Sequence, residues 1–132
     1  MEKMLMRRRN KPAAPPAHLP RIPYEKIKYA ILGDAYDLSY ATVSAREARA
    51  FNKKYRRKSY VPDVLAFPLS KTEGEIVLNV QALAREAKKR KTTLPHFATY
   101  IFIHACLHLK GFRHGKKMRE KERLFLKGMR VV

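Results

Sequence analysis

The feature that most constrains this chain is a strongly apolar segment, His96–Lys110. Thr93 can cap the amino end of a helix here, and Pro95 takes an early helical position that needs no amide donor. Gly111 can adopt the left-handed conformation that ends a helix. We therefore predict a helix over this segment, packed into one compact domain, which 132 residues suffice to form.

Two histidines interrupt the apolar character of this helix. His104 and His108 are four residues apart, so they project from one helix face and can both reach one ion at about 2.0–2.1 Å. The turn at Gly111 can bring His114 back as a third ligand. Three protein ligands leave a fourth tetrahedral position open for water, as in catalytic zinc sites. The spacing predicts one divalent ion, zinc in preference to another transition metal.

The residues between the histidines narrow the chemistry. The metzincin proteases share this histidine spacing but need a glutamate directly after the first histidine, where this chain has Ala105. A peptidase is therefore disfavoured. Cys106 lies two residues from each neighbouring histidine, so we expect it on the opposite helix face, in the core. As the single cysteine it excludes an internal disulfide and fits a reducing compartment, the cytoplasm.

The rest of the chain mixes helical and strand patterns. Ser44 and Glu47 have the spacing of a capping box at the start of one helix. Because helices and strands do not alternate strictly, we predict an α+β fold, a small mixed β-sheet packed against several helices. The further helices are expected at 24–31, 45–55, 81–91 and 116–127, and the strands at 38–43, 64–67 and 74–80.

Charge is the strongest global signal. Thirty Lys and Arg against eleven Asp and Glu give a formal charge of +19, which favours a nucleic acid partner over an anionic membrane or a merely solvated basic surface. No apolar run is long enough to cross a membrane, and the start lacks the apolar stretch of a secretory signal. Residues 1–22 are basic and proline-rich, so we expect a disordered tail before a domain at 23–132.

The histidine segment resembles that of the YbeY family, bacterial endoribonucleases and rRNA maturation factors. The family motif is approximately H-G-x-L-H-L-x-G-Y-D-H, and residues 104–114 are H-A-C-L-H-L-K-G-F-R-H. Residues 51–68 resemble the family's L-N-x-x-Y-R-x-K-D-x-P-T-D-V-L-S-F-P, and residues 74–77 resemble its G-D-I-x-I. The three motifs keep the family's order and spacing, so the resemblance extends over about residues 24–130.

The resemblance implies a histidine helix beside a cleft, zinc at His104, His108 and His114, and a functional arginine at Arg56. It also implies an RNA substrate, with roles in processing the 3′ end of small-subunit rRNA and in ribosome quality control. The partners would be rRNA and the small ribosomal subunit, with no membrane, and we expect a monomer. The chain departs from the family pattern at Ser59, Pro62, Glu75, Ala105, Phe112 and Arg113. We also expect it to lack the family's usual N-terminal strand and to have the basic tail in its place.

Negative charge builds on the phosphoryl oxygens whether water or a ribose 2′-OH attacks the phosphorus. A fixed guanidinium at Arg56 is suited to stabilise that charge. Two basic clusters around Arg56 and the last histidine would bind the phosphate backbone; their candidates are Arg57, Lys58, Lys110 and Arg113. Three hypotheses therefore remain. The first is a metal-dependent endoribonuclease, the second an RNA-binding ribosome-assembly factor with a mainly structural metal, and the third a peptidase or a hydrolase of apolar substrates.

Overall fold

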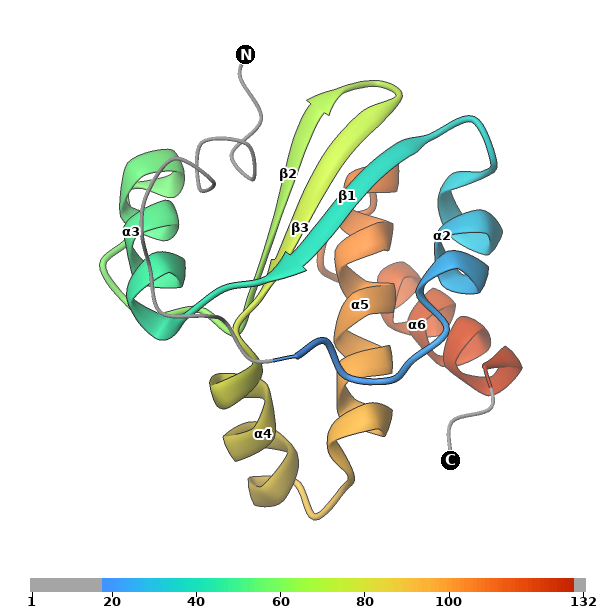
Figure 1. The fold of residues 1–132 in the computed structure, drawn as a ribbon. Coiled ribbons are helices and arrows are strands. Elements are labelled where there is room, and N and C mark those ends of the chain that lie inside the picture. Colours follow the sequence, from blue (N-terminus) through green and yellow to red (C-terminus); the bar gives the residue numbers. More distant parts are fainter. Residues whose placement is uncertain (1–17, 130–132) are drawn as a thin grey trace.

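The computed structural model describes residues 18–129. Its elements, drawn in Figure 1, are α2 (Tyr24–Leu32), β1 (Asp37–Thr42), α3 (Ala45–Arg56), β2 (Val64–Ser70), β3 (Glu73–Leu78), α4 (Val80–Lys89), α5 (Leu94–Lys110) and α6 (Lys116–Gly128). Within the described range, no helix combines the length and the apolar content that a bilayer crossing requires.

The three strands form one mixed sheet, which confirms the α+β class. Their order is β1-β3-β2, with β1 parallel to β3 and β2 antiparallel to it. The central strand β3 is buried from Gly74 to Leu78, as expected for a strand that is paired on both sides and covered on both faces. The sheet therefore separates two layers of helices.

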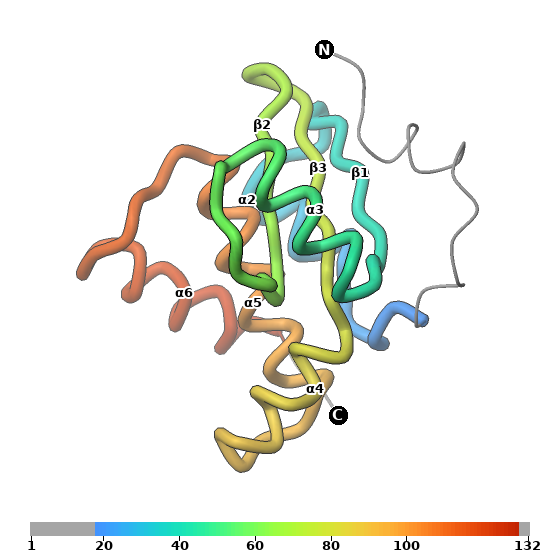
Figure 2. The backbone as a smooth tube through the Cα atoms, turned by 90° about the vertical axis from the view of Figure 1, so that its left-hand side faces the viewer, coloured from blue at the N-terminus to red at the C-terminus, as the bar shows by residue number. Residues whose placement is uncertain are grey.

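Side chains alternate between these two layers along β3. Ile76 and Leu78 pack into the larger core with α5, whereas Val77 packs with Ala48 of α3. Figures 1 and 2 show α3 alone on one side of the sheet and α2 and α5 on the other. α5 is the centre of the larger core, and its Phe102 is fully buried. One face of α5 is thus fixed by the core, which leaves the remaining face to present functional groups.

All the predicted helices and strands are present, and two strand ends differ from the prediction by two or three residues. The strand expected over 74–80 ends at Leu78, because Asn79 caps α4 by accepting the Ala82 N–H at 3.3 Å. The strand expected to end at Phe67 continues to Ser70 through Pro68. Proline is tolerated there because β2 is an edge strand and its pairing with β3 is irregular at that point.

The expected tail falls mostly outside the described residues, since residues 1–17 are not described. The part that is described, residues 18–22, contacts the domain. Pro20 is buried and its carbonyl accepts a hydrogen bond from the Tyr24 hydroxyl at 2.7 Å, while Ile22 packs against the larger core. Packed structure therefore begins a few residues before the predicted start at 23.

Asn79 also connects α4 to the segment that precedes β2. Its side chain is 1% exposed, and its Nδ2 donates to the Pro62 carbonyl at 3.2 Å. Its backbone N–H donates to the Asp63 carbonyl at 2.9 Å. One buried amide therefore starts a helix and fixes the neighbouring loop, which leads into the candidate site.

We expect Asn79→Ala to lower the free energy of unfolding by about 1–3 kcal/mol, because it removes a helix cap and leaves the buried Pro62 carbonyl without its donor. Asn79→Asp keeps the cap acceptor but places a buried carboxylate against the Pro62 carbonyl, so at neutral pH it should be at least as destabilising as Asn79→Ala. Urea denaturation measures both. Thr93→Ala, which removes only the exposed cap of α5, is the matched control. An Asn79→Ala protein that is no less stable than wild type would contradict this role.

Candidate metal centre

The end of α5 places the third histidine beside the first two. The predicted cap at Thr93 is present, with its side chain accepting the His96 N–H at 3.2 Å. Gly111 has φ of 112°, and its N–H donates to the carbonyls of Leu107 and His108. This left-handed turn reverses the chain as the sequence predicts. His114 therefore returns to the face of α5 that carries His104 and His108.

The three histidines form a compact group. Ring centroids are 4.6 Å apart for His104 and His108, 5.2 Å for His104 and His114, and 4.9 Å for His108 and His114. The Nε2 atoms of His104 and His108 lie 3.1 Å apart. Two ligands bound to one tetrahedral zinc at 2.0–2.1 Å are separated by about 3.3 Å. The group can therefore hold one ion, and each histidine can offer a ligand atom within 4.8 Å of the others.

A carboxylate from another helix orients His104. Glu122 of α6 is 4% exposed and accepts a hydrogen bond from His104 Nδ1. A proton held on Nδ1 leaves the Nε2 lone pair free to face an ion. Glu122 is not among the residues predicted from the sequence. The available signal was an acidic residue four positions after the buried Met118, on the face of α6 that packs against α5.

The protonation state of His108 also suits a metal ligand. Burial lowers its pKa below the usual 6.5, and the nearby rings of His104 and His114 lower it further by charge repulsion when protonated. The Phe112 backbone and Glu122 oppose this shift. His108 is therefore neutral at neutral pH, which is the form that binds a metal.

Arg56 is held by two residues near the end of α3. Its Nη1 donates to Asn52 Oδ1 at 3.4 Å and to the Tyr60 hydroxyl at 3.1 Å. Asn52 is fully buried, and its Nδ2 donates to the Tyr60 carbonyl at 3.0 Å. The predicted capping box of Ser44 and Glu47 begins the same helix. An exposed arginine is thereby attached to a buried amide, which restricts where its guanidinium can lie.

Arg56 and the three histidines line one cavity of about 500 Å³. Tyr60 and residues of β2, among them Val64 and Pro68, complete its wall. The structure therefore brings two of the three family motifs, residues 51–68 and 104–114, together across the β2 edge of the sheet. The other predicted substrate-binding residues do not line this cavity and lie exposed on the segments beside it; they are Arg57, Lys58, Lys110 and Arg113.

Cys106 is confirmed as a core residue. It is fully buried, and burial raises the pKa of its thiol, so it stays protonated. It does not line the cavity that contains the histidines. His96 is exposed two turns before His104 and is not in the histidine group either.

Known proteins resemble this chain along most of its length. The family model described as Endoribonuclease YbeY matches residues 21–131. The endoribonuclease YbeY of Bordetella petrii is 35% identical over 106 residues, which cover 73% of this chain and 68% of the relative. That of Bordetella avium is 33% identical over 123 residues, covering 80% and 76%. A solution structure from Thermotoga maritima is similar with a TM-score of 0.59 and 28% identity, covering 78% of this chain and 73% of the other.

We expect Glu122→Gln to weaken zinc binding by about 10–100-fold, because an uncharged acceptor makes His104 a less basic ligand. Competition with a chromophoric chelator measures the affinity. Glu120→Gln, at an exposed position of the same helix, is the control and should bind zinc as wild type does. Equal zinc affinity in both variants would show that the charge of Glu122 does not strengthen His104 as a ligand.

Proposed function

The chain belongs to the YbeY family of endoribonucleases, and from that premise we propose that it is a zinc-dependent endoribonuclease specific for single-stranded RNA. We place it in maturation of the 3′ end of small-subunit rRNA and in ribosome quality control, acting as a cytoplasmic monomer on rRNA and the small subunit. The observation that supports this most is the shared cavity of Arg56 and the histidine group.

His104, His108 and His114 are the proposed ligands. Three imidazoles suit zinc, and the hydrogen bond from His104 Nδ1 to Glu122 leaves Nε2 available. When bound, zinc would act as a Lewis acid and lower the pKa of water to about 7, so that no separate carboxylate base is needed at neutral pH. This fits the cavity, because none of the residues that line it is Asp or Glu.

Arg56 is the proposed catalytic residue contributed by the chain itself. Charge that develops on a phosphoryl group is stabilised best by donors that are already oriented. Asn52 and Tyr60 hold Nη1 of Arg56, so Nε and Nη2 are the groups proposed to contact the phosphate. The same stabilisation serves attack by water and attack by a ribose 2′-OH.

Basic side chains on both sides of the cavity are proposed to bind the RNA backbone. Arg57 and Lys58 follow α3, and Lys110 and Arg113 flank the turn after α5; all four are exposed. Contacts to phosphates position single-stranded RNA without selecting its sequence. Each would therefore affect affinity and its dependence on salt more than the rate of the chemical step.

One observation favours a second candidate, an RNA-binding assembly factor with a mainly structural metal. The contact between His104 and Glu122 joins α5 to α6, so an ion on His104 would also stabilise the packing of these helices. The third hypothesis, a peptidase, has less support because Ala105 is buried beside His104 in place of a glutamate base.

We expect Arg56→Ala to lower the rate of cleavage of single-stranded rRNA precursor fragments by about 10²–10³-fold while zinc content is unchanged, because a preorganised donor is lost. His108→Ala should lose both zinc and cleavage. Gel analysis of cleavage, with zinc measured by atomic emission, checks both. Arg46→Ala, at an exposed position of α3, is the control. Cleavage at the wild-type rate in both site variants would refute the nuclease proposal.

Metal removal distinguishes the first two candidates. A nuclease treated with chelator should keep its circular dichroism spectrum and its RNA affinity but lose turnover, and zinc should restore it. An assembly factor should instead lose helix packing and RNA binding together when the metal is removed. Cleavage of casein in the absence of RNA cleavage would favour the peptidase.

A further inference from the structure

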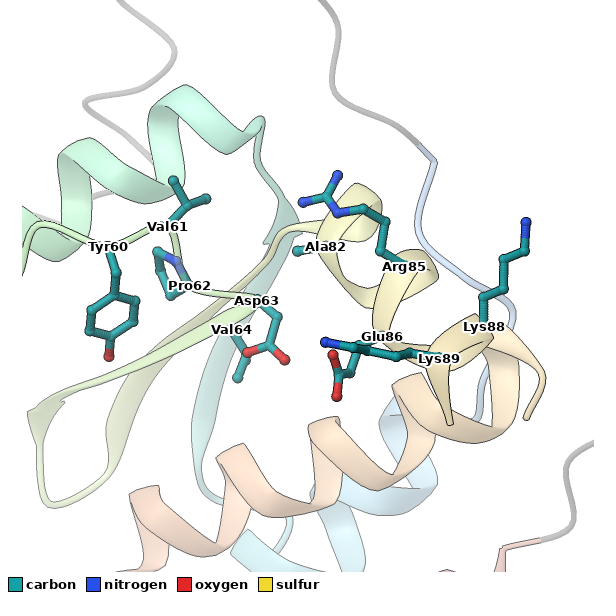
Figure 3. A pocket seen from close by; sticks show the side chains of 10 residues that line it. All are labelled: Tyr60, Val61, Pro62, Asp63, Val64, Ala82, Arg85, Glu86, Lys88 and Lys89. Carbon is teal, nitrogen blue, oxygen red and sulfur yellow. The ribbon is translucent and has the colours of Figure 1, made fainter. Parts of the chain in front are cut away.

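A second cavity, of about 740 Å³, adjoins the one that contains the histidines. It lies between α4 and the segment Tyr60–Val64, as Figure 3 shows. Tyr60 and Val64 line both cavities, so the two cavities lie next to each other along this segment. A polymer that leaves the histidine group over Tyr60 would therefore enter the second cavity.

The α4 side of this cavity is basic. Residues 85–91, R-E-A-K-K-R-K, contain five cations and one acid. Arg85 and Lys89 point from α4 toward the segment opposite, whereas Lys88 points away from it (Figure 3). Both are exposed. These two cations are therefore placed to meet a polyanion lying in the cavity.

The two acidic residues of the cavity have partners within the protein. Glu86 binds Arg90, with Arg90 Nε 3.0 Å from Glu86 Oε1. The Asp63 carboxylate accepts the backbone N–H groups of Asp63 and Val64, although burial still raises its pKa. Neither acid forms an ion pair with Arg85 or Lys89. The cations facing the cavity are thus available to an external anion.

Tyr60 supplies an aromatic surface where the cavities meet. Its side chain is 52% exposed, so it is not a core residue. Its hydroxyl accepts from Arg56 Nη1, which restricts the ring at the edge of the histidine cavity. Unpaired bases stack on exposed, oriented aromatic rings, and bases in a duplex cannot.

We propose that the second cavity binds single-stranded RNA that extends from the cleaved bond, with its phosphates on Arg85 and Lys89 and a base stacked on Tyr60. This inference rests on the proposed nuclease function and specifies its substrate, a strand long enough to reach α4. A short RNA fills only the histidine cavity and gains nothing from α4. A longer RNA gains affinity from both cavities.

The test compares fluorescein-labelled single-stranded RNAs of about 4 and about 12 nucleotides, lengths that span the site sizes typical of such proteins. Affinity is measured by fluorescence anisotropy over a range of salt concentrations, and cleavage is measured separately with zinc-loaded full-length protein. The variant is Arg85→Gln with Lys89→Gln. The control, Lys26→Gln with Lys127→Gln, removes the same charge from exposed positions on α2 and α6.

For the α4 variant we expect at least about a tenfold loss of affinity for the longer RNA, and a salt slope reduced by about 0.7 for each lost phosphate contact. Binding and cleavage of the short RNA should match wild type. Equal losses on both RNAs, equal losses in the control, or no loss at all would each overturn the inference. If the proposed nuclease function fails, wild type will cleave neither RNA. The binding data would still show whether Arg85 and Lys89 add affinity for the longer RNA.

Discussion

The structure depends on α5, which belongs to the hydrophobic core and also carries the candidate metal ligands. Phe102, Ile103 and Leu107 are buried at 0–1% exposure, so the helix has one packed orientation. His104 and His108 then have to face the β2 edge, where burial would cost free energy if their ring nitrogens lacked partners. The hydrogen bond to Glu122 satisfies one of these nitrogens, and each histidine also offers one nitrogen where an ion can bind. Core packing thus positions the candidate ligands.

The second part of the site comes from a different layer of the fold. Arg56 ends α3, which lies on the opposite side of the sheet from α5 (Figure 1). It reaches the histidine cavity because Asn52, fully buried, holds both the Arg56 side chain and the Tyr60 backbone. Asn79 fixes the next part of the same segment through Pro62 and Asp63. Two buried amides therefore maintain the wall that Tyr60 contributes to both cavities.

Much of this arrangement could be predicted from the sequence. The histidine spacing and Gly111 predict the metal group because helical periodicity and a left-handed turn are local properties. The caps at Ser44 and Thr93 are local for the same reason. The end of β3 was predicted two residues late, because an apolar Val80 suits a strand as well as the first turn of α4. The family resemblance, rather than any local pattern, singled out Arg56 among thirty cations.

Other features depend on long-range packing and were not predicted. Glu122 is eighteen residues from His104, and its partner could not be identified until α6 was placed against α5. The position of α4 beside Tyr60 likewise depends on the sheet order, in which β2 is at an edge. The sequence shows that residues 85–91 are basic, but not that they lie next to the histidine cavity.

The most direct test of the central claim is the rate of single-turnover RNA cleavage measured while zinc is added to metal-free protein. If the three histidines form one catalytic zinc site, the rate should rise in proportion to added zinc and stop rising at one zinc per chain. A cleavage rate that is already maximal before zinc is added, or no cleavage when the zinc site is fully occupied, would contradict the account.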